Sequence, residues 1–384
     1  MSWAWSCTHH NNAMKTETLQ LVSASPGLRH SLQVLRFGQP GTGPKAMIQA
    51  ALHADEVPAL LVARYLREAL TELDAAGAVL GEVVLVPYAN PLGLAQHVMG
   101  QHQGRFDLRD GINFNRQVPD VSATVAQAVQ GRLGDDAVAN VLCVRQALRE
   151  AVAALTAPRP TDDLKLQLLR LAIDADIVLD LHCDADAVLH LYGLTPQADL
   201  CTELGALLGA QAILLATESG DSPFDEACSR PWLVVQQQHP GHPLPLACFS
   251  STVELRGEAD TSHALAQQDA QAIIHFLRRR GVLAGPMPDL PPARCEATPL
   301  AGSEPVVAPC SGILVFQQTP GAWVEAGSVV ADLVDAETGA LLPLCAQSAG
   351  VLYARAATRW ATPGQRVAKI AGRALQRTGK LLSP

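Results

Sequence analysis

Residues 46–56 read AMIQAALHADE, an apolar run that ends in polar side chains. The run has the length of a buried β-strand, and residues 57–73 then carry apolar side chains every three or four positions, as an amphipathic helix does. We therefore expect a strand, a loop and a helix. Further runs of strand type alternate with helical patterns, which predicts an α/β fold with a largely parallel sheet. These runs are residues 82–86, 176–183, 212–216 and 247–255.

Four further segments have the apolar spacing of helices. They are residues 123–155, 161–175, 200–208 and 263–280. Pro158 and Pro160 separate the first two, and the last closes with RRR before Gly281, which suits the carboxyl end of a helix.

Length and composition set the class of protein. At roughly 150 residues per domain, 384 residues predict two or three domains. Hydrophobic residues make up 48% and charged residues 17%, which excludes intrinsic disorder. The net charge of -9 argues against a nucleic-acid partner, although an acidic protein can still hold a local cationic pocket.

The cysteines and the apolar runs bear on the compartment. Nine scattered cysteines form no C-x-x-C pair, which fits a reducing environment. There is no leader-like start and no uninterrupted run of about 18 apolar residues. We expect a cytoplasmic protein that does not bind membranes.

A change in composition at Gly281 divides the chain. Residues 281–305 are rich in Pro and Gly without helical or strand period, as in a connection between domains. The expected organisation is a disordered extension over residues 1–20, a catalytic domain over 21–285 and a C-terminal β-domain over 286–384.

The C-terminal part contains a weak internal duplication. Residues 308–334 are echoed by 346–372, each half with a glycine, a short strand, a turn and a second glycine. This resembles the biotinyl/lipoyl barrel-sandwich fold, whose carriers present a modifiable lysine between the halves. Here that hairpin reads DAETGALLP (335–343), and no lysine lies between Lys165 and Lys369. We therefore expect the domain to cover the site or mediate assembly.

The candidate chemistry begins with His53 and Glu56, spaced H-x-x-E where the first strand meets its helix. Such a pair can place an imidazole nitrogen and a carboxylate oxygen on one metal ion. The alternative is a solvated helix start, at which Asp55 and Glu56 favour the helix dipole.

Two later strand ends supply further groups. His182 follows IVLDL and Glu254 lies in STVEL, at the strand ends where open α/β sheets place ligands. Two histidines and a glutamate leave zinc a position for water, and a nearby carboxylate can take a proton from that water. The alternatives are an ordinary strand-end histidine and an exposed glutamate paired with Arg256.

An arginine-rich segment, GRFDLRDGINFNR (104–116), is the fourth piece. Guanidinium groups match carboxylates in a bidentate geometry, which predicts an anionic substrate. The alternative is a set of surface arginines paired with Asp107 and Asp110.

Taken together, the ordered motifs H-x-x-E, N-x-N-R, strand-end His and V-E-L resemble the succinylglutamate desuccinylase/aspartoacylase family of the zinc carboxypeptidase superfamily. The resemblance covers roughly residues 30–280. It implies a mostly parallel mixed sheet flanked by helices and one zinc ion per chain. It also implies the following roles: His53, Glu56 and His182 as metal ligands, Glu254 as general base and acid, Asn115 and Arg116 as the carboxylate-holding pair, and Arg105 or Arg109, with Arg105 favoured, as the further arginine.

The sequence departs from the family pattern at two points. The position two before the Asn-Arg pair, commonly an aspartate that supports the first zinc histidine, is Asn113 here, which predicts a less basic His53 and weaker zinc binding. Relatives also use a tyrosine near the substrate. Tyr192 is the candidate here, because the next tyrosine is Tyr353.

These residues predict zinc-dependent hydrolysis of an amide bond in a small N-acyl amino acid or another small molecule with a carboxylate. One alternative is a carboxypeptidase that acts on a peptide or peptidoglycan C-terminus, because the same groups serve that reaction. Another is a non-catalytic protein that binds zinc or a ligand. A homo-oligomer is compatible with the sequence.

Overall fold

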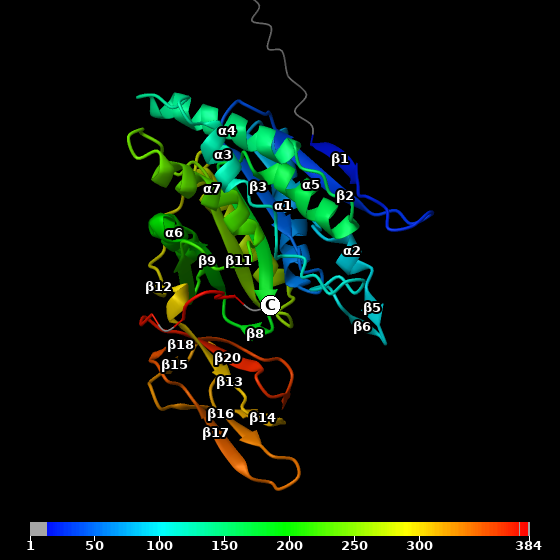
Figure 1. The fold of residues 1–384 in the computed structure, drawn as a ribbon, viewed down its shortest axis with the longest axis vertical. Helices are drawn as coiled ribbons and strands as arrows, with labels where there is room; N and C mark the ends of the chain where they lie inside the picture. Colours follow the sequence, from blue (N-terminus) through cyan, green and yellow to red (C-terminus); the bar gives the residue numbers. More distant parts are fainter. Residues whose placement is uncertain (1–13, 376, 383–384) are drawn as a thin grey trace, which may run out of the picture.

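The computed structural model describes residues 14–375 and 377–382, and its centre is a twisted mixed sheet (Figure 1). Within these residues the sheet has nine strands. From one edge to the other they are β1 (Lys15–Gln20), β2 (Ser31–Gly38), β4 (Glu82–Val86), β3 (Lys45–Ala50), β7 (Ile177–Asp184), β11 (Phe249–Gly257), β9 (His190–Leu194), β10 (Ala212–Ala216) and β12 (Ala297–Pro299). The central strands β4, β3, β7 and β11 are parallel, and β9 runs antiparallel to β11.

Helices cover both faces of this sheet (Figure 1). One apolar core is shared with α1 (Pro58–Ala75), α6 (Ala198–Leu208) and α8 (His263–Arg279). The other core is shared with α3 (Ser122–Ala128), α4 (Ala137–Ala153), α5 (Pro160–Ala172) and α7 (Phe224–Gln238). A short helix α2 (Pro91–Leu94) and a small hairpin of β5 (His97–Val98) and β6 (Gln101–His102) lie beside the carboxyl ends of the central strands.

The central strands are apolar because both of their faces are covered. Every residue of β4 is buried, as are all but the first residue of β3 and all but the last residue of β7. Alternate residues of β7 point into the two cores: Leu179 and Leu181 into one, Val178 into the other. Asp180 and His182 share the face of Val178, so the strand carries polar groups on one face only.

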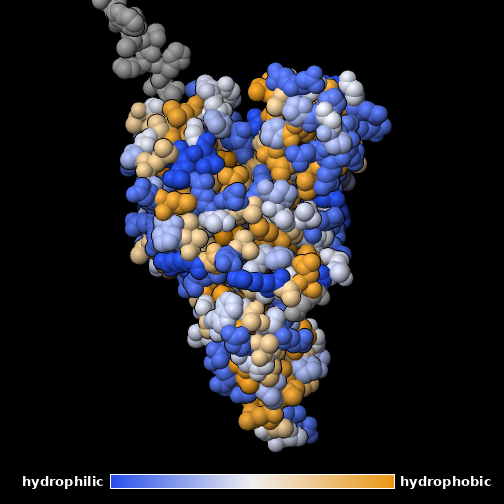
Figure 2. All heavy atoms as spheres, turned by 90° about the vertical axis from the view of Figure 1, so that its left-hand side faces the viewer, coloured by the Kyte–Doolittle hydropathy of each residue, from blue (hydrophilic) through white to orange (hydrophobic). Residues whose placement is uncertain are grey.

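The C-terminal module, residues 303–371, consists of two small antiparallel sheets. One contains β13 (Ser303–Val307), β20 (Arg366–Ala371), β18 (Gly350–Arg355) and β15 (Trp323–Val324), and the other contains β17 (Leu341–Cys345), β16 (Val329–Val334), β14 (Gly312–Phe316) and β19 (Trp360–Ala361). The module extends from the larger unit and shows hydrophobic side chains towards its far end (Figure 2).

The internal duplication is visible as two repeats of three strands. In the first repeat, β14, β15 and β16 follow one another as β18, β19 and β20 do in the second. Each repeat lends its middle strand to the other, since β14 pairs with β19 and β18 pairs with β15. A Cβ atom on Gly312 or on Gly350 would meet the carbonyl of the last strand of its own repeat, Val334 or Ala371. The two glycines therefore occupy equivalent close contacts.

The module is joined to the large sheet by a strand pair and by ion pairs. The short strand β8 (Asp186–Ala187), which follows β7, pairs with β18 of the module. Arg355 Nε lies 2.7 Å from Asp186, and Lys369 Nζ lies 2.5 Å from Asp184. Because β7 also carries His182, the module is attached next to the candidate metal site.

The structure corrects several expectations about the elements. The expected helix over residues 123–155 is two helices, α3 and α4, with Gly131 at a positive φ of 71° between them. The expected disordered extension lies mostly outside the described residues, but Lys15–Gln20 form β1. The strand β12, inside the expected C-terminal domain, belongs to the large sheet. Residues 190–194 and 224–238, for which no element was expected, form β9 and α7.

Among the described residues, no helix is both long and apolar enough to span a membrane.

Candidate metal centre and its cavity

Three neighbouring strands deliver the candidate residues to one edge of the sheet. His53 lies three residues beyond the end of β3, and His182 lies in β7 beside it. Glu254 in β11 is directly paired with His182 across the parallel strands. Glu56 follows His53 in the loop before α1, so the H-x-x-E spacing brings its carboxylate back towards both histidines.

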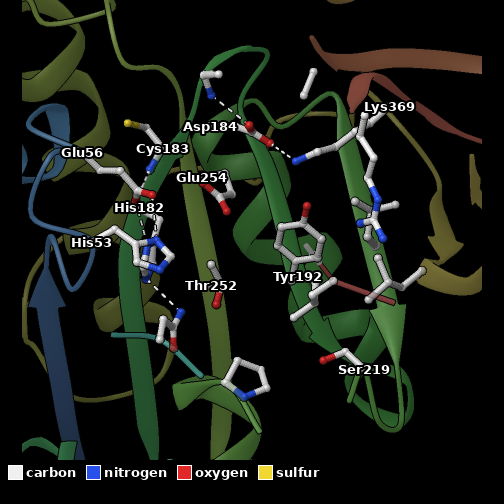
Figure 3. Close-up of a pocket in the computed structure, with 18 of the residues that line it drawn as sticks. His53, Glu56, His182, Cys183, Asp184, Tyr192, Ser219, Thr252, Glu254 and Lys369 are labelled. Atoms are coloured by element: carbon white, nitrogen blue, oxygen red, sulfur yellow. Dashed lines mark hydrogen bonds and ion pairs between the residues drawn. The ribbon is translucent and has the colours of Figure 1, made fainter. Parts of the chain in front are cut away.

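The two histidines and Glu56 form a compact buried trio (Figure 3). His53 Nδ1 lies 2.8 Å from Glu56 Oε1, and His182 Nδ1 lies 2.7 Å from Glu56 Oε2. One potential ligand atom from each residue lies within 4.8 Å of the others. Glu56 is 4% exposed, which contradicts the alternative of a solvated helix start.

The outer nitrogens of both rings have fixed partners. His53 Nε2 lies 2.9 Å from Asn113 Oδ1, and His182 Nε2 lies 3.0 Å from Asp180 Oδ2. Asn113 Oδ1 accepts a hydrogen bond from His53 Nε2, so His53 Nδ1 presents a lone pair, while Asp180 places a negative charge behind His182. Two imidazole nitrogens and a carboxylate that converge in this way fit a metal ion, which would replace the proton that His182 Nδ1 otherwise shares with Glu56.

Electrostatics keep the trio ready for a cation. Burial, followed by the charge of Arg105, lowers the pKa of His53 to about 4. Burial would also lower the pKa of His182, but the carboxylates of Asp180 and Glu56 outweigh it and raise that pKa. Burial alone would raise the pKa of Glu56, yet the two imidazoles hold it well below its usual range. At pH 7 Glu56 is therefore ionised, His53 is neutral, and His182 carries a proton that a bound cation would replace.

Glu254 faces the trio without a partner of its own. Its Oε2 is buried and makes no hydrogen bond with the described residues. Burial, together with the charge of Glu56, raises the pKa of Glu254 to about 8. Arg256 does not pair with it, because its guanidinium binds Asp269 at 2.8 and 2.9 Å. The pairing of β11 with β7 shifts register after Glu254 and resumes between Gly257 and Asp184, and Arg256 has a φ of 72°, so a bulge follows Glu254 within the strand.

The structure separates the two arginines that the sequence left open. Arg105 Nη1 lies 3.3 Å from His53 Nδ1 and 3.5 Å from Glu56 Oε1, at the mouth of the site. Arg109 instead holds Asp107 with its Nε and Nη2 atoms, at 2.9 and 2.6 Å, and does not line the cavity. The surface pairing that the sequence allowed thus applies to Arg109 and excludes it from the candidate site.

Asn115 and Arg116 lie on the other side of the trio. Asn115 Nδ2 is 3.3 Å from His182 Nε2, while its Oδ1 accepts a hydrogen bond from Phe224 N at the start of α7. Arg116 is 8% exposed, and its Nη1 donates to the carbonyl of Asn115 at 2.7 Å. Burial lowers the pKa of Arg116, so this guanidinium is a desolvated cation beside the metal trio.

These groups open into one cavity of about 450 Å³ (Figure 3). The trio lies at one end, Thr252 and Glu254 follow, and Tyr192 and Ser219 lie farther along. Residues 354–358 and 365–369 of the C-terminal module form part of the wall. The module therefore helps to shape the site, which is one of the two roles that the sequence analysis expected of it.

Two features of the site, Asp180 and the pair of Lys369 and Asp184, were missed by the sequence analysis. Asp180 supports His182, and the signal was present, because residues two apart in a strand share a face. The pair of Lys369 and Asp184 joins distant segments and leaves no local signal. Cys183 lines the cavity, but burial raises the pKa of its thiol, so it is not activated as a nucleophile.

Comparison with known proteins decides the family. Residues 42–280 match the succinylglutamate desuccinylase/aspartoacylase catalytic domain. The chain belongs to this family. No curated protein sequence matches it.

Solved structures agree with this family assignment. A succinylglutamate desuccinylase/aspartoacylase family protein from Shewanella amazonensis is similar at 27% identity and a TM-score of 0.83, covering 93% of this chain and 98% of that one. A protein of the same description from Shewanella frigidimarina has 23% identity and a TM-score of 0.84, covering 94% and 98%. The ectoine utilization protein EutE (DoeB) from Ruegeria pomeroyi shares the fold, with 17% identity, a TM-score of 0.66 and coverage of 94% and 96%. The family is one of deacylase-type hydrolases, and the likeness extends over the C-terminal module.

Proposed function

We propose that the protein is a zinc-dependent hydrolase that cleaves the amide bond of a small N-acyl amino acid or a similar carboxylate-bearing compound. The observation that carries this proposal is the trio of His53, Glu56 and His182 beside an unpartnered Glu254. A metal-binding protein without catalysis needs the trio but has no use for a partly buried carboxylate with a free oxygen.

Two imidazole nitrogens and one carboxylate oxygen are the ligands that catalytic zinc sites use. When bound, zinc would polarise the amide carbonyl and acidify the attacking water. Asn113 holds the His53 ring by a hydrogen bond to its Nε2, and the charge of Asp180 lies 3.0 Å from His182 Nε2.

Glu254 is the proposed general base and acid. A zinc ion in the trio would favour the ionised form of Glu254, whose carboxylate lines the cavity and would take a proton from the attacking water and return it to the leaving amine. Tyr192 lies farther along the same cavity, where its hydroxyl could donate to the substrate.

Arg116 and Asn115 are the proposed carboxylate-binding pair. A desolvated guanidinium at the cavity wall binds a carboxylate more strongly than an exposed one does, because water competes less. Arg105, over the opposite side of the trio, is placed to stabilise negative charge that develops on the carbonyl oxygen.

The direct test is a screen of N-acyl amino acids for release of free amine. Protein loaded with zinc is compared with the same protein after treatment with a chelator and after zinc is restored. We expect hydrolysis that is lost with the metal and returns with it. Hydrolysis that continues after the chelator has removed the metal would contradict the proposal. So would the absence of hydrolysis for every compound in the panel.

A further inference from the structure

Beyond the metal trio, the cavity continues into a chamber with apolar walls. We define the apolar chamber by the residues of the cavity that are apolar or aromatic and lie away from the trio: Tyr192, Leu194, Leu214, Ala216, Leu300 and Leu382. An acetyl or succinyl group bound at the trio would leave this space unfilled, since cavities of roughly 300–1,000 Å³ hold drug-sized ligands and this one has about 450 Å³.

The strand register shows that the chamber is a continuation of the catalytic face. Thr252, two residues before Glu254, pairs with Tyr192 on β9, and Tyr192 pairs with Leu214 on β10. Two residues farther along the same strands, Leu194 on β9 pairs with Ala216 on β10. Because paired residues share a face, one sheet surface runs from the metal trio to these apolar side chains. Three strand spacings of about 4.8 Å separate β7 from β10, so this surface is roughly 14 Å wide.

The end of the described chain closes the chamber. Leu381 N donates to the carbonyl of Ser219 at 2.8 Å, which holds residues 377–382 against the loop after β10. Leu382 lines the cavity beside Leu300, and both belong to the apolar cluster that joins the large sheet to the C-terminal module. The chamber is thus built by contacts between the two units and not by the catalytic sheet alone.

The charged groups near the chamber are largely compensated. On the module side, Lys369 is bound to Asp184 and Arg355 to Asp186. On the helix side, Glu226 accepts a hydrogen bond from Ser219 N at 2.7 Å. Burial raises the pKa of Asp225 to about 7, so this carboxyl group is partly neutral there. Lys369, Arg355 and Glu226 thus already have polar partners when an uncharged chain packs beside them.

We propose that the cavity takes amides that carry an aliphatic chain in addition to their carboxylate, with the chain in the apolar chamber. This inference rests on the proposed function, because the metal trio and Arg116 fix the amide and the carboxylate. The chain can belong to the acyl group or to the amino acid, and the same chamber would recognise either.

The test compares substrates that differ in one group. Nα-acetylnorleucine places an aliphatic chain on the amino acid, N-hexanoylaspartate places it on the acyl group, and N-acetylaspartate has neither. Nα-acetyllysine has the length of norleucine with an added ammonium. We expect a kcat/KM at least about tenfold higher for one of the two aliphatic substrates than for N-acetylaspartate, as several buried methylenes give. Equal rates, or a preference for the lysine substrate, would overturn the inference.

Ala216→Phe fills the chamber from the end of β10 and should remove the advantage of the aliphatic chain. The matched control is Thr217→Phe, because Thr217 is the next residue, is exposed and does not line the cavity. Melting temperature and zinc content show whether each variant folds and loads. An unchanged preference in a folded Ala216→Phe variant would contradict the proposal.

A binding measurement separates this inference from the proposed function. Calorimetry on the Glu254→Gln variant, which should not turn over, is expected to show tighter binding of the preferred aliphatic substrate than of N-acetylaspartate. Preferential binding with no turnover by the parent would refute the hydrolase and keep the chamber. Zinc-dependent turnover without a preference for aliphatic chains would support the hydrolase and refute the proposed role of the chamber.

Discussion

The two ends of the cavity are built in different ways. At the metal end, His182 lies in β7 while His53 and Glu56 lie in the loop that follows the adjacent strand β3, and each ring nitrogen has a defined polar contact. At the chamber end, β9 and β10 meet Leu300 and Leu382 from the C-terminal part of the chain, through apolar contacts.

This difference assigns reaction and specificity to separate parts of the molecule. The metal end depends on exact hydrogen bonds, which tolerate little change. The chamber end depends on shape, which changes whenever residues at the contact between the two units change. Relatives could therefore keep the reaction while they alter the substrate.

The largest effect is expected from a substitution of the proposed general base at the metal end. Glu254→Gln keeps the size of the side chain but removes the proton acceptor, so kcat should fall by roughly 10²–10⁴-fold while zinc content stays near the parent value. Steady-state kinetics and elemental analysis on the same preparation check both points. Retained turnover would remove Glu254 from the mechanism.

A smaller effect is expected at the residues that orient the histidines. Asp180→Asn should weaken zinc binding by roughly 10–100-fold, because the negative charge behind His182 is lost. Asn113→Asp is the opposite change behind His53 and should tighten binding. Zinc affinity is measured by competition with a chelator of known strength, and equal affinities for both variants and the parent would refute this role.

The contact that builds the chamber end can be weakened at Lys369. Lys369→Met removes the ion pair with Asp184, and the loss of a partly buried charged hydrogen bond should cost about 1–3 kcal/mol in the free energy of unfolding. Lys369→Arg is the matched control, because it keeps the positive charge. The free energy of unfolding is measured by denaturant titration. Equal values for the parent and the Lys369→Met variant would show that the ion pair does not hold the module in place.

The smallest expected effect is a pH dependence at the wall of the chamber. Because burial and the nearby Glu226 raise the pKa of Asp225 to about 7, the folded state loses stability as pH rises through 7, when Asp225 must ionise. Asp225→Asn should therefore melt a few degrees higher than the parent at pH 8, with the difference vanishing near pH 4. A constant difference at all pH values would point to packing instead.

The sequence predicted the metal end far better than the chamber end. His53, Glu56, His182 and Glu254 lie at or near the ends of apolar strands, and such strand ends meet at one edge of an α/β sheet. The helix α7 was missed, because Pro231 lies inside it and a segment rich in Pro and Gly follows it. The chamber was missed because Leu214, Leu300 and Leu382 lie far apart in the chain, and each looks like an ordinary core residue.

Zinc content measured by elemental analysis is the most direct test of the central claim. It compares the parent, purified without a histidine tag and reconstituted with zinc, with the His53→Ala/His182→Ala double variant, whose folding is checked by circular dichroism. We predict about one zinc ion per parent chain and little in the variant, since two of three ligands are gone. Equal zinc in both proteins, or none in the folded parent, would contradict a metal centre at His53, Glu56 and His182.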